Sequence, residues 1–93
     1  MATLHIEHAI TDLAIWLGAF ARFEEARRKA GVRAERIFQP ADDEHYLYVQ
    51  LDFDNIEQAA AFKQFLETNV WASAQASPGL GGAPQAQVLV AVE

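Results

Sequence analysis

Hydrophobic and polar residues alternate along two stretches of this chain, at positions 3–10 and 45–53. In the first stretch, the side that carries the aliphatic residues Leu4 and Ile6 also carries His8. A period of two residues is typical of a β-strand that buries one of its faces. We therefore predict a strand in each stretch, with an apolar face and a more polar face.

Two further strands are predicted from composition and position. Residues 32–39 are followed at 40–44 by a proline and acidic residues, which are typical of a turn. Residues 86–92 are rich in valine, which favours extended backbone. The stretches 32–39 and 45–53 are close enough in the chain to form a hairpin.

Between residues 12 and 31 the hydrophobic residues recur at steps of three and four, which predicts one amphipathic helix. Asp12 offers a side-chain oxygen to cap its start, and Gly31 offers a stop at its end. Basic residues just before Gly31 lie where the negative end of the helix dipole favours them. The apolar stripe, which we expect to pack on the sheet, consists of Leu13, Trp16, Leu17, Phe20 and Phe23.

A second helix is predicted over residues 54–70. Asn55 followed three residues later by Gln58 resembles a capping box at its start. Glycine and proline crowd the following segment, residues 76–84, which we predict to be a loop. The apolar stripe of this helix consists of Ile56, Ala59, Phe62, Leu66 and Val70.

The resulting element order is β-α-β-β-α-β, the ferredoxin-like arrangement of an α+β domain. At 93 residues the chain is long enough for one domain, which we assign to residues 1–93. The fold predicts an antiparallel sheet with both helices on one face. The other face of the sheet must then meet water, a ligand or a second subunit.

Composition narrows the function classes. The formal net charge is -6 and no long basic stripe occurs, so we expect no nucleic-acid partner. No apolar run is long enough for a membrane span, and the start of the chain does not read as a secretion signal, so we expect no membrane association and a cytoplasmic location. The absence of cysteine excludes disulfides and thiolate metal ligands.

The segments HAITDLAIWLGAFARFEEARRKAGVRAERIF and DDEHYLYVQLDFDNIEQAAAF resemble small bacterial proteins of the antibiotic-biosynthesis-monooxygenase-like family, in the dimeric α+β barrel superfamily. The resemblance rests on the pattern of Trp16, Phe20 and Gly31, on the acidic turn and on the junction LDFDNIEQAAAF. It implies a homodimer whose uncovered sheet faces form a barrel. Relatives include oxygenases that act on aromatic polyketides without a cofactor, which implies a small aromatic ligand and no cofactor.

One branch of the family degrades haem, and this chain departs from its pattern. That branch needs an asparagine on the first strand and a histidine shortly after a tryptophan late in the chain. Trp71 stands where the tryptophan would, but the first strand has no asparagine and no histidine follows His45. Haem degradation is therefore not the expected activity.

Candidate site residues come from the polar sides of the two alternating strands. Strands one and three are neighbours in the ferredoxin-like order, so we expect His5 and Glu7 to meet Tyr46, Tyr48 and Gln50. A histidine beside a carboxylate can act as a base, and tyrosines can hold a phenolic substrate. The same residues would also make a polar dimer interface with satisfied hydrogen bonds, and this alternative stays open.

In the fold of the family, Trp71 and the loop 76–84 would flank the mouth of the cleft, so Trp71 is a candidate substrate contact; packing in the core or an interface is its alternative. No metal site is predicted, because His5 and His8 fall on opposite faces of one strand. Two functions remain. The first is a cofactor-independent monooxygenase with His5 and Glu7 as the acid–base pair. The second is a non-catalytic ligand-binding or stress-response module.

Overall fold

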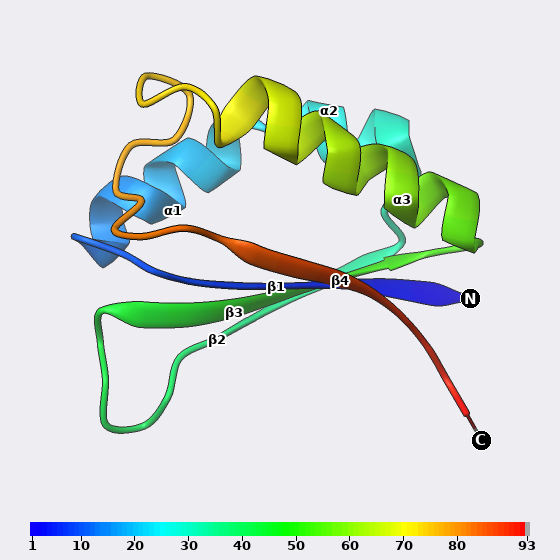
Figure 1. The fold of residues 1–93 in the computed structure, drawn as a ribbon, viewed down its shortest axis with the longest axis horizontal. Helices are drawn as coiled ribbons and strands as arrows, with labels where there is room; N and C mark the ends of the chain where they lie inside the picture. Colours follow the sequence, from blue (N-terminus) through cyan, green and yellow to red (C-terminus); the bar gives the residue numbers. More distant parts are fainter. Residues whose placement is uncertain (93) are drawn as a thin grey trace.

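The chain folds into one sheet layer covered on one face by one helix layer (Figure 1). The computed structural model describes residues 1–92. Its four strands are antiparallel and lie in the order β2-β3-β1-β4. The ferredoxin-like α+β fold predicted from the sequence is confirmed. The strands span Ala2–Ala9 (β1), Ala34–Phe38 (β2), Tyr46–Phe53 (β3) and Gln85–Val90 (β4).

Burial alternates along the central strands β1 and β3, as the sequence pattern predicts. The side of β1 that faces the helices carries Leu4, Ile6 and His8, all of them buried. The register sets Leu4 opposite Leu51 of β3, so the apolar faces of the two strands coincide. The other side of the sheet carries no helix, and we call it the open face.

The core lies between the sheet and the helices. Its largest fully buried side chains come from β1 and β3, and Ala59 and Phe62 of α3 pack against them. Phe53 and Phe62 meet with their ring centroids 5.9 Å apart. The fully buried group consists of Phe53, Leu4, Leu47, Leu51 and Val49.

The prediction of one continuous helix over residues 12–31 is wrong in one respect. The helix is broken into two. Helix α1 spans Leu13–Arg22 and α2 spans Glu24–Ala30, with Phe23 outside helical geometry between them. The Phe23 ring packs edge-on against Phe65, which anchors the break. Leu17, predicted to face the sheet, is instead exposed on α1.

The second predicted helix, 54–70, changes form near its end. Helix α3 spans Ile56–Phe65 and continues as a wide π-helical turn, η1, over Leu66–Val70. The Trp71 amide donates to the carbonyl of Leu66 at 2.7 Å, which closes this wider turn. The predicted cap is confirmed, because the Asn55 side chain accepts from the Gln58 amide at 2.8 Å. Ile56, predicted as part of the apolar stripe, is exposed.

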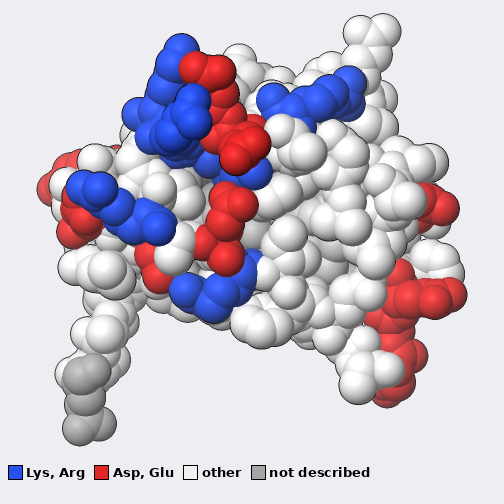
Figure 2. All heavy atoms as spheres, turned by 180° about the vertical axis from the view of Figure 1, so that it is seen from behind, with Lys and Arg blue, Asp and Glu red and all other residues white. Residues whose placement is uncertain are grey.

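The basic residues do not form an uninterrupted surface. Figure 2 shows lysines and arginines spread over the left and upper parts of the face in view with carboxylates between them, and carboxylates without lysine or arginine at its right edge. Several of these residues are paired, including Arg28 and Lys29 with Glu25, and Arg33 with Asp54. Within residues 1–92, no helix is both long enough and apolar enough to cross a bilayer.

Two glycines of the helix layer give opposite stability predictions. Gly18 lies inside α1, where an added Cβ would meet no atom within 4 Å outside its own helix turn, so Gly18→Ala should raise the free energy of unfolding by about 0.5–1 kcal/mol. Gly31 has a φ of 98°, which disfavours a side chain, so Gly31→Ala should lower the free energy of unfolding by about 1–2 kcal/mol. Urea unfolding of both variants measures the two effects. Equal shifts would contradict the assigned backbone conformations.

Candidate functional site

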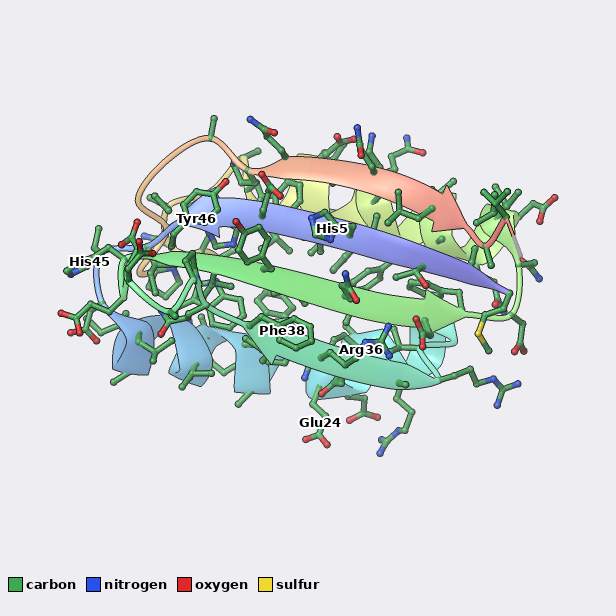
Figure 3. The ribbon with its side chains drawn as sticks, turned by 90° about the horizontal axis from the view of Figure 1, so that it is seen from below. His5, Glu24, Arg36, Phe38, His45 and Tyr46 are labelled. Carbon is green, nitrogen blue, oxygen red and sulfur yellow. The ribbon has the colours of Figure 1, made fainter. Side chains whose placement is uncertain are left out.

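The five polar residues predicted to converge do so on the open face, and we call them the open-face cluster. His5 Nε2 lies 3.0 Å from a carboxylate oxygen of Glu7, and Gln50 Nε2 lies 3.3 Å from His5 Nδ1. The Tyr46 hydroxyl donates to the second Glu7 oxygen at 3.1 Å. The Tyr48 ring lies 5.9 Å from the His5 ring. Figure 3 looks onto this face, with His5 and Tyr46 on neighbouring strands.

The protonation states of this cluster follow from its partners. The Gln50 amide donates to Nδ1 of His5, so Nε2 carries the proton that is donated to Glu7. The donors His5 and then Tyr46 hold the pKa of Glu7 below its ordinary value. Partial desolvation and the Glu7 carboxylate raise the pKa of Tyr46. A carboxylate stabilised in this way is a weak proton acceptor.

A second ionic group extends the polar surface of the open face toward β2. The Arg36 guanidinium donates to both oxygens of Asp52, at 2.8 and 2.9 Å, and Thr3 donates to Asp52 at 2.8 Å. The hydrogen bonds from Arg36 lower the pKa of Asp52. These residues were not among the predicted site residues, although the alternation of the two strands places Thr3 and Asp52 on this face. Phe38, half exposed, lies beside Arg36 on β2 (Figure 3).

Trp71 does not join the open-face cluster. It lies on the helix side of the sheet and lines a mostly apolar cavity of about 70 Å³, which we call the helix-side cavity. The predicted loop 76–84 contributes one wall of this cavity through Ala76, Ser77, Pro78 and Leu80. The structure therefore brings Trp71 and the loop together and separates both from His5 and Glu7.

A row of rings forms a second wall of the helix-side cavity. The His8 and Trp16 rings are 6.0 Å apart, and Trp16 stacks on Phe20 at 5.0 Å. The guanidinium carbon of Arg27 lies 3.6 Å from the centre of the Phe20 ring. His8 and Arg27 are thus the two polar ends of an aromatic row, and both line the cavity.

The loop that forms this wall lies close to the backbone between the end of β1 and the first turn of α1. Gly79 has a φ of 83°, and a Cβ there would lie 3.0 Å from the backbone nitrogen of Trp16. Its carbonyl accepts from the Thr11 amide at 2.8 Å. A Cβ on Gly81 would similarly lie 3.0 Å from the backbone of Ile10. These glycines let the loop pack directly on the segment that leads into α1.

His8, for which no role was predicted, lines the cavity together with Arg27. It is 3% exposed, and its Nδ1 lies 2.9 Å from the carbonyl of Ala9. A carbonyl only accepts, so Nδ1 carries the proton and the neutral ring keeps a lone pair on Nε2. Within residues 1–92 no hydrogen bond to Nε2 is found. Burial lowers the pKa of His8, although the bond to Ala9 opposes that shift.

The signal for His8 was present in the sequence. A histidine in the apolar half of an alternating strand is buried by the strand's own pattern, and a buried imidazole without a charged partner stays neutral. Among residues 1–92 no three histidine, aspartate or glutamate side chains are grouped to hold a metal ion.

Comparison with known proteins identifies relatives of the fold. No protein-family model and no curated protein matches the sequence. Among solved structures, an antibiotic biosynthesis monooxygenase aligns over 100% of both chains with a TM-score of 0.66 and 15% identity. A Nitrosomonas europaea protein provisionally assigned the same name aligns over 100% of both chains with a TM-score of 0.69 and 16% identity.

A third structural neighbour is a dimeric ferredoxin-like protein from an uncultured marine organism. It aligns over 99% of this chain and 95% of its own, with a TM-score of 0.65 and 8% identity. Likeness at this level of identity shows a shared fold. Proteins named antibiotic biosynthesis monooxygenase are thus among the structural neighbours, in agreement with the resemblance seen in the sequence.

His8 should make the stability of the protein depend on pH. Its pKa is lowered in the folded chain, so as pH falls below about 6.5 the unfolded chain takes up the proton first and the free energy of unfolding decreases. His8→Phe should flatten this slope by up to about 1.4 kcal/mol per pH unit, measured by urea unfolding from pH 7.5 to 5. His45→Gln, at an exposed position, is the control. An unchanged slope in His8→Phe would refute the assignment.

Proposed function

We propose that the protein is a cofactor-independent monooxygenase that binds a small aromatic molecule in the helix-side cavity. The observation that carries the proposal is His8, which lines a cavity walled by aromatic rings and has no hydrogen bond at Nε2 within residues 1–92. Apolar walls with few polar groups are typical of small-molecule sites. The structural neighbours named antibiotic biosynthesis monooxygenase support this class of activity.

The proposed reaction uses His8 as the general base. Nε2 takes the proton of a phenolic hydroxyl, and the resulting phenolate is electron-rich enough to react with dioxygen at a ring carbon that carries hydrogen. A C–O bond forms, the O–O bond then breaks, and that carbon becomes a carbonyl. One oxygen atom stays in the quinone product and the other leaves as water together with the two hydrogens of the substrate. The imidazole is restored to its neutral form.

We propose that the open face is the interface of a homodimer of single-domain chains. The helices leave this face uncovered, and it carries half-buried tyrosines together with the exposed apolar residues Phe38 and Leu89. Polar residues with satisfied hydrogen bonds and tyrosines are common in such interfaces. The structural neighbour described as a dimeric ferredoxin-like protein supports the same assembly.

His5 and Glu7 remain the second candidate for the acid–base pair. Their hydrogen bonds are satisfied within the cluster, and the lowered pKa of Glu7 weakens it as a base, which favours His8. A ligand-binding module without catalysis is the remaining alternative. It differs from the enzyme in binding an aromatic compound without consuming dioxygen.

Activity should depend on His8 rather than on the open-face cluster. With a panel of mono- and dihydroxylated benzenes, the wild-type chain should consume dioxygen, and His8→Phe should slow that consumption by about 10²-fold or more. Glu7→Gln and His5→Gln should keep the rate within a few-fold. An oxygen electrode measures all four proteins. Loss of activity in Glu7→Gln with the dimer intact would move the chemistry to the open face, and binding without oxygen uptake would favour the non-catalytic module.

The oligomeric state should respond to charge on the open face alone. Tyr48→Arg buries an unpaired charge in the proposed interface and should yield a monomer in native mass spectrometry and light scattering. Ile15→Arg is the matched control, because Ile15 is 52% exposed on the outside of the helix layer, and it should stay dimeric. A wild-type monomer would overturn the proposed assembly.

A further inference from the structure

We infer that the aromatic ligand carries a carboxylate that binds Arg27, so that the substrate class is a single-ring hydroxylated aromatic acid. The inference rests on the proposed function, because it assumes that the helix-side cavity is the ligand site. It adds the chemical group that the cavity selects and the residue that selects it. Neither the fold nor the aromatic walls determine that group.

Arg27 is a buried cation with spare hydrogen-bonding capacity. The residue is 4% exposed. Its Nε donates to Glu35 at 2.7 Å, and its Nη1 donates to the carbonyl of Phe20. Within residues 1–92 no hydrogen bond from Nη2 is found, and no fully buried side-chain nitrogen lacks a partner, so Nη2 retains accessible surface. A guanidinium presents five N–H donors, and its planar edge matches a carboxylate.

The surroundings keep this guanidinium in place. The guanidinium carbon lies 3.6 Å from the Phe20 ring centre, so a cation–π interaction holds the positive charge over the face of the ring. Glu35 is on β2 and its side chain is 41% exposed, so Glu35 holds Nε from the water side. Of the residues that line the cavity, Arg27 is the one with a permanent charge. Glu35 already balances this charge, so an anion in the cavity would share the guanidinium with Glu35 through the nitrogen Nη2.

The two polar ends of the aromatic row give the ligand an orientation. A carboxylate at Arg27 and a hydroxyl at His8 would place the ring of the ligand along Trp16 and Phe20, which link the two ends. Size adds a limit. A cavity of about 70 Å³ has room for roughly five water-sized groups, since one needs about 10–15 Å³. An engineered protein cavity that holds a single benzene ring measures about 150 Å³, so the walls of the helix-side cavity must give way for one substituted ring, and three fused rings would need still more space.

Binding of para-hydroxybenzoate and its neutral analogue para-hydroxybenzamide tests the inference. Isothermal titration calorimetry of the wild-type chain should give at least a tenfold preference for the carboxylate. Arg27→Met should remove that preference while keeping the amide affinity within a few-fold. Arg28→Met is the matched control, since the neighbouring Arg28 side chain is 71% exposed, and it should keep the preference. Circular dichroism verifies that each variant is folded.

A second variant covers the case in which Arg27→Met does not fold. Glu35→Gln leaves the guanidinium in the cavity but removes its partner's charge, so carboxylate affinity should rise a few-fold and amide affinity should stay constant. Equal wild-type affinity for the two probes would overturn the inference and leave the aromatic site standing. If wild-type protein binds neither probe nor any neutral hydroxybenzene, the proposed function fails with it.

Discussion

The pleat of β1 is the constraint on which both sites depend. Because successive side chains of a strand point to opposite faces, one eight-residue strand sends His8 under the helices and His5 to the open face. The antiparallel register with β3 then decides the neighbours of each, setting Glu7 opposite Tyr48 and His8 opposite Leu47. A slip of one residue would exchange the imidazoles between an apolar cavity and a hydrogen-bonded surface.

The two faces of the sheet give two histidines of the same strand different hydrogen-bonding states. On the open face His5 is held by an amide on one nitrogen and a carboxylate on the other, so neither nitrogen is spare. Under the helices His8 has a carbonyl on one nitrogen, which fixes its tautomer and leaves the other nitrogen as an acceptor. Hydrogen bonds on both ring nitrogens fix the orientation of His5. Burial favours the neutral form of His8.

Alternation along two strands, helical periodicity between them and the strand order that follows were enough to predict the fold class and the convergence of the open-face cluster, and alternation placed His8 on the apolar side of its strand. These patterns were not enough for the helix-side cavity, because that cavity depends on two departures from regular helix. Phe23 interrupts the first helix through its packing on Phe65, and Arg27 is buried beyond this break. The wide turn η1 lies between α3 and Trp71. Both departures are set by tertiary packing, and a periodic stripe carries no sign of them.

The loop wall of the cavity closely approaches backbone at two points, where Gly79 meets Trp16 of α1 and Gly81 meets Ile10 before α1. The sheet supplies the imidazole and the broken helix supplies the guanidinium, so neither polar group belongs to the loop. Under the proposed function, the two polar groups that meet the ligand and the loop wall of its site therefore lie in separate parts of the chain. Such a division would allow the loop wall to vary while His8 and Arg27 stay in place.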